Sequence, residues 1–372
     1  MSDGERTRTE ILPTRKIYAV DLFCGAGGLT NGLTRAGIDV QLGIDVDPIC
    51  EFPYTANNKA KFLLKSVEDL GANDIEKFFR KRSIRLLAGC APCQTFSTYN
   101  QKATSEDDRW WLLLHFSRLA KELSPELITM ENVPRLINHD VFKQFVKDLQ
   151  GAGYCVSHCV VNCADYGVPQ HRQRLVLLAS RLGPIRFLTP LEFGASARTV
   201  RAVIGNLPHL TAGETHSSDP LHQAATLSET NVLRIKASQP GGTWRDWREN
   251  LIAGCHRKPT GKTYPSVYGR MCWDRPAPAI TTQFFGFGNG RFGHPQQDRA
   301  ISLREGAILQ SFPEDYVFSR PGEPISKKSV GKLIGNAVPP VLGEVIGKSI
   351  VAHVEDSMRK RRKIQAEARQ YV

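Results

Sequence analysis

The stretch that decides the fold is residues 17–28, IYAVDLFCGAGG, in which an apolar run leads directly into a turn with three glycines. A short, continuously apolar run is typical of a strand buried on both faces of a parallel sheet. Glycines allow a tight turn and let a ligand approach backbone N–H groups closely. The run and its turn therefore predict the first strand and first loop of an α/β domain, although the glycines would also suit a tight connection that binds nothing.

Further strands and helices follow on both sides of this turn. Residues 41–45 (QLGID) predict a second strand that ends in Asp45, whose carboxylate can accept hydrogen bonds from ribose hydroxyls. Apolar runs alternate with segments of helical spacing, which indicates a parallel sheet covered by helices. Later strands are expected at 84–88, 127–131 and 174–179, and helices at 110–123, at 141–151 and after Pro340, the last packing back onto the first domain.

The pattern changes between about residues 186 and 275, which are rich in Gly, Pro, Thr, Arg and His. This region holds twelve Lys and Arg against seven Asp and Glu and lacks a long periodic segment. Such composition predicts irregular structure with many loops. We therefore expect a catalytic and cofactor-binding domain formed by residues 1–185 and 320–372, and a smaller irregular domain with its hinge at 186–319.

The charge and the cysteines limit the setting of the protein. An excess of 49 Lys and Arg over 37 Asp and Glu gives a net charge of +12 and favours a polyanionic partner. Part of that excess is the run 359–363 (RKRRK), expected at the exposed end of a terminal helix. Nine scattered cysteines suit a reducing compartment, and the polar first residues and absence of a long apolar run indicate a cytoplasmic protein without a membrane span.

Three cysteines, Cys155, Cys159 and Cys163, lie close together in the sequence. Their spacing differs from the paired short spacings of zinc sites, and the β-branched residues between them favour an extended segment. We therefore expect no metal.

Residues 89–97, GCAPCQTFS, follow the apolar run 84–88 and place Cys93 where a loop begins. A cysteine attacks as its thiolate and needs a partner or an environment that favours that form. Most isolated cysteines are instead small buried apolar residues. Cys93 stands apart because four other segments occur in a fixed order around it: 21–29 (DLFCGAGGL), 131–133 (ENV), 170–174 (QHRQR) and 335–340 (GNAVPP).

Together these five segments resemble the DNA (cytosine-5)-methyltransferase family, from about Lys16 to about Ile350. The resemblance implies an α/β fold with the sheet of S-adenosylmethionine-dependent methyltransferases and a second, smaller target-recognition domain at 186–319. It implies S-adenosylmethionine as cofactor and double-stranded DNA as partner. The glycine spacing also matches the nicotinamide fingerprint poorly, which disfavours a dehydrogenase.

The resemblance also implies residues for the cofactor. Phe23, Gly25 and Gly27 would line the methionine and adenosyl portions, and Asp45 would hold the ribose. At the position of the family's acidic residue for the adenine amino group this chain has Ser66, so Glu68 or a backbone carbonyl is an alternative there. The remaining cofactor residues expected are Pro92, Asn336 and Val338.

For catalysis, the resemblance implies that Cys93 adds to carbon 6 of cytosine, which makes carbon 5 able to take the methyl group. Glu131 would hold ring nitrogen 3 and the exocyclic amine, and a protonated carboxyl would offset charge that builds as sulfur attacks. Arg174 would reach oxygen 2 of the base, and Arg172 would contact a phosphate or support the active site. Glu131 could instead be an ordinary acid at a strand end, and either arginine a surface residue.

The target base must leave the duplex to expose both of its faces. The polar segment 95–109, with Ser97, is expected to close over the DNA, or to be a plain surface loop. In the basic middle region the candidates for phosphate and base contacts are Arg245, Arg248, Arg257 and Arg270, with Lys258 beside them and His256 as a weaker one.

The leading hypothesis is a site-specific DNA cytosine-5 methyltransferase, a monomeric, stand-alone prokaryotic enzyme that modifies chromosomal DNA in the nucleoid, with or without a cognate restriction endonuclease. An enzyme that methylates tRNA is an alternative with the same fold, and a catalytically silent DNA-binding relative is another. Intact Cys93, Glu131 and Arg174 argue against the silent relative.

Overall fold

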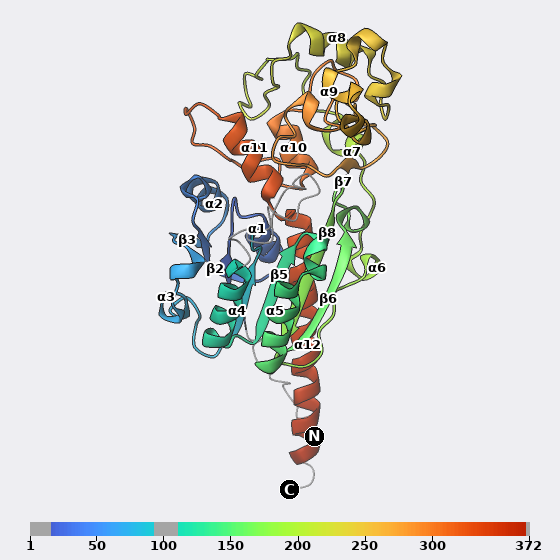
Figure 1. Ribbon diagram of the computed structural model, residues 1–372. Coiled ribbons are helices and arrows are strands. Elements are labelled where there is room, and N and C mark those ends of the chain that lie inside the picture. The colour runs from blue at the N-terminus through green and yellow to red at the C-terminus, as the bar shows by residue number, and fades with distance from the viewer. Residues whose placement is uncertain (1–15, 93–110, 370–372) are drawn as a thin grey trace, which may run out of the picture.

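The computed structural model describes residues 16–92 and 111–369. Its centre is a seven-stranded sheet with the order β3-β2-β1-β4-β5-β8-β6 (Figure 1). Neighbouring strands from β3 to β5 run parallel, whereas β8 is antiparallel to both β5 and β6. The sheet therefore has the predicted α/β architecture, with one reversed strand near its edge. The strands are β1 (Ile17–Leu22), β2 (Asp39–Asp45), β3 (Lys61–Leu64), β4 (Ile84–Gly89), β5 (Leu127–Asn132), β6 (Cys155–Asn162) and β8 (Gln173–Ser180).

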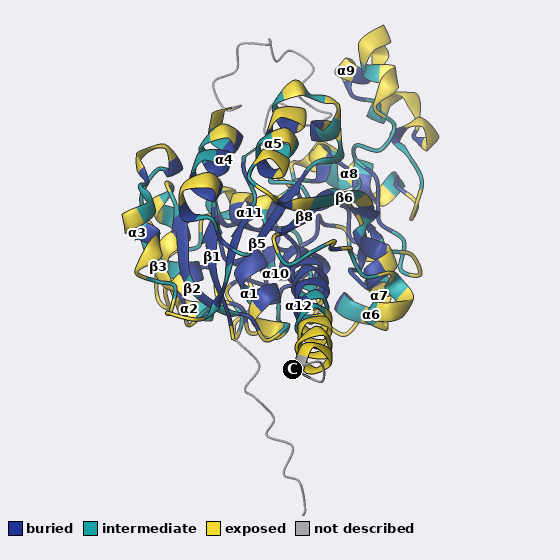
Figure 2. Cartoon of the chain, turned by 90° about the horizontal axis from the view of Figure 1, so that it is seen from below, coloured by how far each residue is buried: buried dark blue, intermediate teal, exposed yellow. Residues whose placement is uncertain are grey.

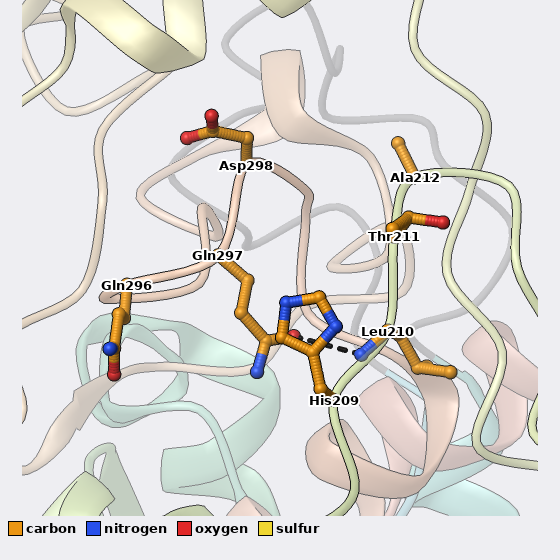
Figure 3. A pocket seen from close by; sticks show the side chains of 7 residues that line it. All are labelled: His209, Leu210, Thr211, Ala212, Gln296, Gln297 and Asp298. Carbon is orange, nitrogen blue, oxygen red and sulfur yellow. Dashed lines mark hydrogen bonds between the residues drawn. The ribbon is translucent and has the colours of Figure 1, made fainter.

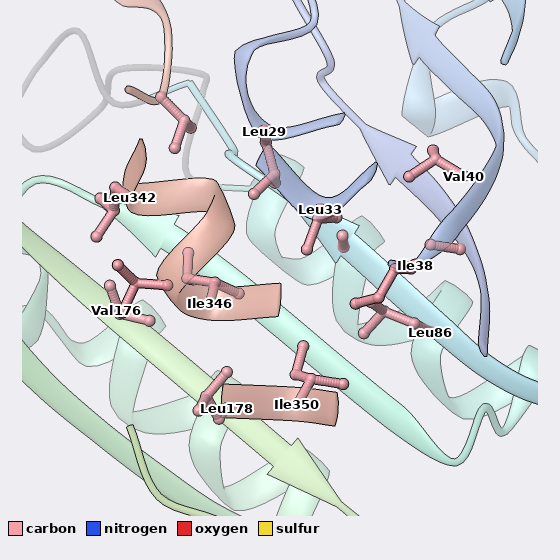
Figure 4. Close-up of a cluster of buried hydrophobic side chains, with 14 of the residues drawn as sticks. Leu29, Leu33, Ile38, Val40, Leu86, Val176, Leu178, Leu342, Ile346 and Ile350 are labelled. Atoms are coloured by element: carbon pink, nitrogen blue, oxygen red, sulfur yellow. The ribbon is translucent and has the colours of Figure 1, made fainter. Parts of the chain in front are cut away.

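Helices cover both faces of the sheet, which explains why its central strands are apolar throughout. In β4, Leu86 packs in the cluster with α1 (Gly28–Arg35) and α12 (Pro340–Arg369). The next residue, Leu87, packs on the other face with α4 (Trp111–Leu123) and α5 (Asp140–Gly151). Figure 4 shows the first cluster, in which side chains from the two helices meet those of the strands. Two short helices, α2 (Glu51–Asn57) and α3 (Ala72–Glu76), lie near β3 (Figure 1).

The first and last helices of the catalytic region are in unusually close contact. A Cβ atom placed on Gly32 of α1 would lie 2.2 Å from the carbonyl oxygen of Pro340, at the start of α12. On α12, a Cβ on Gly343 would lie 3.1 Å from the carbonyl oxygen of Leu29. Only glycine permits such a separation of the two backbones, so these residues fix α12 against the helix that follows the first loop.

The second region lies beyond the carboxyl ends of the strands, at the top of Figure 1. It consists mainly of irregular segments, as the composition predicts. A minimal two-stranded sheet, β7 (Gln170–His171) with β9 (Ala277–Pro278), joins it to the catalytic region. Its helices are α7 (Val200–Ile204), α8 (Glu229–Ala237), α9 (Gly254–Arg257), α10 (Leu303–Leu309) and α11 (Lys327–Asn336). The short helix α6 (Pro190–Phe193) instead lies beside the sheet, where Phe193 packs against the cluster that contains α12 (Figure 1).

One apolar cluster spans the expected domain boundary between residues 319 and 320. It contains Phe284 and Ala307 from one side and Leu333 and Ile334 from the other. The helix α11 therefore shares its core with the second region, and the proposed division of the chain at this point remains a prediction.

The last helix tests two further predictions, one about its exposed basic end and one about membrane-spanning segments. Residues 359–363 are exposed at the projecting end of α12, as expected (Figures 1 and 2). The stretch Lys327–Ala368 is long and apolar enough for a membrane span, with a mean hydropathy of 1.2 in its most apolar window, contrary to the expectation that no apolar run reaches that length. However, 61% of that window is buried, and α12 packs on α1 and the sheet, as a core helix does.

Candidate active site and nucleic-acid interface

The loop after β1 takes the conformation that its glycines predict. Phe23, Gly25 and Gly27 all have positive φ angles, of 57°, 53° and 88°. A Cβ atom on Gly27 would lie 2.5 Å from Asn58 Nδ2, whereas a Cβ on Gly25 would meet no heavy atom of the described residues within 4 Å. Gly27 is thus required by packing, and Gly25 borders open space in which a ligand can approach the backbone.

Asp45 at the end of β2 lies against this loop. Its Oδ2 accepts a hydrogen bond from Gly25 N at 2.9 Å, and its Oδ1 accepts one from Asp47 N at 3.0 Å. The next residue, Val46, is 68% exposed although it is apolar. Val46 was not predicted as a site residue, although an apolar residue directly after an acid at a strand end was a usable signal. The carboxylate and the apolar side chain together offer one polar and one apolar surface beside the glycine loop.

Ser66 and Glu68 follow β3 and have other partners in the structure. Ser66 begins a short 3-10 turn, and its Oγ accepts a hydrogen bond from Glu68 N at 3.3 Å. Glu68 Oε1 accepts a hydrogen bond from the indole of Trp111 at 2.9 Å. The side chains of Ser66 and Glu68, the two candidates for contact with the adenine amino group, therefore form hydrogen bonds with other residues of the protein.

The late segment 335–340 meets the glycine loop through its backbone. A Cβ atom on Gly28 would lie 2.2 Å from the carbonyl oxygen of Val338. Val338 is buried, and Asn336 is exposed at the end of α11. The structure thus places the backbone of Val338 against the turn that leads into α1.

Three side chains converge at the carboxyl ends of β4 and β5. Glu131 is 2% exposed, and its Oε1 lies 2.7 Å from Nε of Arg174, at the start of β8. Its Oε2 accepts a hydrogen bond from Cys90 Sγ at 2.8 Å. The sequence predicted that Glu131 and Arg174 both hold the target base, whereas Cys90 was not predicted as a site residue. Its position next to the end of β4 was the only available signal.

Arg172 lies two residues before Arg174, inside the protein. It is 4% exposed, and its guanidinium donates to the carbonyl oxygens of Ile280 at 2.7 Å and Gly335 at 2.9 Å. Burial, together with the nearby charge of Arg174, lowers the pKa of Arg172 to about 9. The structure therefore favours support over phosphate contact, because these two hydrogen bonds join the strand of the active site to the second region and to the late segment.

Gln170 reinforces the same junction and was not predicted as a site residue. Its Nε2 donates to the carbonyl oxygen of Leu309 at 2.9 Å, and its Oε1 accepts from Ile280 N at 2.9 Å. Ile280 is thus held through both of its backbone polar groups, one by Gln170 and the other by Arg172.

The loop after β4 is tied to β5 as far as the structure describes it. Asn132 Nδ2 donates to the carbonyl oxygen of Ala91 at 3.0 Å, and the half-buried Pro92 follows. Cys93 and Ser97 lie outside the described residues, as does the whole segment 95–109. The described part of this loop ends at Pro92, one residue before the predicted nucleophile.

Three of the four arginines predicted to contact DNA are exposed in the second region: Arg245, Arg248 and Arg257. The guanidinium of Arg245 lies over the ring of Trp244, 5.6 Å from its centroid, and also donates to the carbonyl oxygen of Lys262 at 2.7 Å. Arg257 donates to the carbonyl oxygen of Glu249 at 2.7 Å. Their positions are compatible with contact to phosphates.

The structure contradicts the prediction for Arg270. This side chain is 5% exposed, and its guanidinium donates to the carbonyl oxygens of Ile235 at 2.8 Å and His294 at 2.9 Å and pairs with Asp298. Its donors are used to hold the second region together. The weaker candidate, His256, is also buried, stacked on Trp244 with 4.4 Å between ring centroids.

A pocket of about 460 Å³ lies in the second region (Figure 3). The hydrogen bond from Leu210 N to Gln297 Oε1, at 3.2 Å, joins its two sides. None of the described residues predicted for cofactor, base or DNA lines it. The pocket is formed by His209, Leu210, Thr211, Ala212, Gln296, Gln297 and Asp298.

Among residues 16–92 and 111–369, no group of three or more His, Cys, Asp or Glu side chains could hold a metal. Cys155 and Cys159 lie on the extended strand β6, and Cys163 begins the turn after it. Burial raises the pKa of Cys163 to about 11, which keeps this thiol protonated at neutral pH.

Comparison with known proteins identifies the family. The family model for C-5 cytosine-specific DNA methylases matches residues 17–352. The Type II methylase M.HgiDII of Herpetosiphon aurantiacus is 49% identical over 346 residues, which cover 92% of this chain and 97% of that protein. The Type II methyltransferase M1.HphI of Haemophilus parahaemolyticus is 32% identical, over 89% of this chain and 86% of its own length.

Solved structures agree on the fold. A protein of an Escherichia coli prophage, described as a DNA modification methyltransferase, superposes with a TM-score of 0.69 at 21% identity, covering 91% of this chain and all of the other. The DNMT2 of Spodoptera frugiperda gives a TM-score of 0.63 at 16% identity, over 91% and 99% of the two chains. With the family model and the close relatives, these similarities establish that the chain belongs to the C-5 cytosine-specific DNA methylase family and is a DNA (cytosine-5)-methyltransferase.

Proposed function

We propose that this enzyme methylates cytosine at one short sequence of double-stranded DNA, with Cys93 as nucleophile and S-adenosylmethionine as methyl donor. The observation that carries the proposal is the convergence of Glu131 and Arg174 at the strand ends, 2.7 Å apart, beside the loop that leads into Cys93. An acid and a base-orienting cation at the start of a cysteine-bearing loop suit addition to a pyrimidine ring better than hydride transfer.

The residues of the glycine loop fit the cofactor. The open space beside Gly25 admits a ligand to the backbone, and Asp45 and Val46 offer a ribose acceptor and an apolar surface next to it. S-adenosylmethionine, when bound, supplies an electrophilic methyl group. Phe23, Gly27, Ser66, Pro92, Asn336 and Val338 complete the proposed cofactor residues, with Ser66 contributing through the turn that it caps.

In the proposed reaction, the Cys93 thiolate forms a bond to carbon 6 of cytosine, and electron density moves to carbon 5, which takes the methyl group. Glu131 holds ring nitrogen 3 and the exocyclic amine, and Arg174 holds oxygen 2. Their low exposure strengthens these interactions, because little water competes for them. The proton at carbon 5 then leaves to water, the bond to Cys93 breaks, and the thiolate is restored.

Arg172 acts in this proposal as a support rather than as a group that touches the base. By joining Ile280 and Gly335, it fixes the second region relative to the strand that carries Arg174. The exposed arginines Arg245, Arg248 and Arg257 neutralise DNA phosphates or read base edges, and Ser97 contacts the DNA beside the extruded cytosine.

The decisive experiment is incubation of the purified protein with plasmid DNA and methyl-labelled S-adenosylmethionine, followed by base-resolution sequencing for 5-methylcytosine. We expect label confined to cytosines of one short motif, and none with the Cys93→Ala variant, which should still bind the cofactor. Equal labelling by that variant would refute the role of Cys93. Label on tRNA and none on DNA would move the substrate to RNA.

We further propose that the enzyme acts in the cytoplasm, on nucleoid DNA, as a monomer, in a restriction-modification system or as an orphan methylase. The Type II names of its relatives support the restriction context. Plasmid isolated from cells that express the enzyme should resist a restriction endonuclease that cuts at the methylated motif. Size-exclusion chromatography with light scattering tests the monomer, which should have the 41.4 kDa mass of one chain.

A further inference from the structure

The carboxyl group of Glu131 has a second neighbour that the proposed reaction does not use. Cys90 Sγ donates a hydrogen bond to Glu131 Oε2 at 2.8 Å, on the opposite oxygen from Arg174. A carboxylate held on one oxygen alone can rotate about its terminal torsion, which is broad and shallow. With the ion pair to Arg174 on one oxygen and the thiol hydrogen bond on the other, rotation of the Glu131 carboxyl group is restrained.

The strand register explains why Cys90 reaches this position. β4 and β5 are parallel neighbours, and Gly89 pairs with Met130. Residues 90 and 131 therefore follow the last pair on adjacent strands, where side chains in step lie on the same face of the sheet. Cys90 N also donates to the carbonyl oxygen of Leu22 in β1, which holds the Cys90 backbone in line with the sheet.

We propose that Cys90 is a positioning residue for the target base, which orients the Glu131 carboxyl group through its thiol hydrogen. The inference rests on the proposed function, because it assigns Cys90 a role toward the residue that would hold cytosine. The thiol does not touch the base and forms no covalent bond in this role. Its contribution is geometric: it keeps Glu131 in the one orientation that meets nitrogen 3 and the exocyclic amine together.

Removing the thiol has a calculable consequence. A hydrogen bond to a charged group corresponds to roughly a 10-fold to 100-fold change in an equilibrium or rate. The Cys90→Ala variant should therefore have a kcat lower by about that factor, with little change in KM for DNA. Serine also donates a hydrogen bond, so Cys90→Ser should recover most of the lost kcat, although its hydroxyl is held on a shorter bond.

The separate values of kcat and KM distinguish misorientation of Glu131 from loss of fold. Misorientation should lower kcat in Cys90→Ala while KM for DNA and the melting temperature stay near their wild-type values, and Cys90→Ser should restore kcat. Arg172, Arg174 and Cys163 also lie near this carboxyl group, and the wild type and both Cys90 variants retain them.

The experiment compares four proteins in steady-state methylation of an oligonucleotide duplex: wild type, Cys90→Ala, Cys90→Ser and Cys159→Ala. Cys159 is a matched control, because it is a half-buried cysteine on β6 outside the proposed active site. A loss of kcat in Cys90→Ala that Cys90→Ser restores, with unchanged KM for DNA and wild-type behaviour of Cys159→Ala, supports the proposal.

Two results would overturn it. Wild-type kcat in Cys90→Ala would show that Glu131 needs no thiol. Equal loss of kcat in Cys90→Ala and Cys90→Ser, with a lower melting temperature in both, would show a packing role only. Failure of the proposed function looks different, because the wild-type protein itself would then leave cytosine in DNA unmethylated.

Discussion

Arg174 Nε lies 2.7 Å from Glu131 Oε1, at a place where the side chains are only 15% and 3% exposed. Removing one member of such a buried pair leaves the other charge without compensation, which costs about 3–5 kcal/mol. In this enzyme the same arginine is proposed to hold oxygen 2 of cytosine, so its loss should affect turnover as well as stability.

We therefore expect Arg174→Ala to lower the single-turnover rate about 100-fold or more, with a much smaller change in DNA affinity. Rapid-quench methylation assays and fluorescence anisotropy with labelled duplex measure the two quantities separately. Arg181→Ala is the matched control, since Arg181 is exposed at the other end of β8. A steep loss of affinity with unchanged turnover would instead make Arg174 a phosphate contact.

Substitution of Gly28 tests the contact between the loop after β1 and the segment 335–340. A Cβ atom there would lie 2.2 Å from the carbonyl oxygen of Val338, so Gly28→Ala should separate the two backbones. Overpacking of this kind costs about 1–3 kcal/mol. Chemical denaturation should show that loss, and calorimetry should show weaker binding of S-adenosylmethionine. Gly151→Ala, where the new Cβ meets no atom within 4 Å, should leave cofactor binding unchanged.

The buried carboxyl group of Asp21 should make the stability of the protein depend on pH. This carboxyl group is 1% exposed, and burial raises its pKa from the ordinary value of 3.8 to about 7. Between these two pH values the unfolded chain releases the proton and the folded chain keeps it, so stability should fall as the pH rises through that window.

Melting temperatures from pH 4 to 8 check this expectation, and the Asp21→Asn variant should not show this contribution to the fall in stability. Thr30 Oγ1 donates to Asp21 Oδ2 at 2.7 Å, an acceptor that an asparagine side-chain oxygen can replace. Asp69→Asn, at an exposed position after β3, should retain the wild-type dependence. An identical pH dependence in Asp21→Asn would exclude Asp21 as its source.

Arg245 and Arg270 should behave in opposite ways. Arg245→Gln should weaken DNA binding and reduce the slope of log affinity against log salt by about 1, with stability nearly unchanged. Arg270→Gln should instead destabilise the protein by about 3–5 kcal/mol, because it leaves buried carbonyl groups and Asp298 without their donor. Salt titrations of DNA binding and thermal unfolding of both variants distinguish the two roles. A normal melting temperature for Arg270→Gln would contradict the structural assignment.

The sequence was a reliable guide where local pattern alone determines structure. The strands predicted from continuous apolar runs correspond to β1, β4, β5 and β8, because burial on both faces requires such runs. The second region and the exposed end of α12 follow from composition in the same way. By contrast, β3 was missed because Lys61–Leu64 is short and only partly buried at the sheet edge.

The site could be predicted only in part, because side-chain partners come from distant segments. Nothing near Arg270 in the sequence shows that its guanidinium meets carbonyl oxygens 24 and 35 residues away. The contact between Cys90 and Glu131 can be recognised only when the register of β4 and β5 is known. Charge and residue type predicted which groups are present, and only the fold determined which of them face solvent.

The close packing of α12 on α1 has a consequence for synthesis of the protein. Leu29 and Leu33 of α1 bury against Leu342 and Ile346, more than 300 positions later in the chain. A ribosome-bound chain therefore carries an uncovered apolar helix behind its cofactor loop until the last helix emerges. Because contacts of such long separation form late and slowly, the partly made enzyme should depend on chaperones, and premature termination before residue 340 should yield aggregates rather than a smaller active protein.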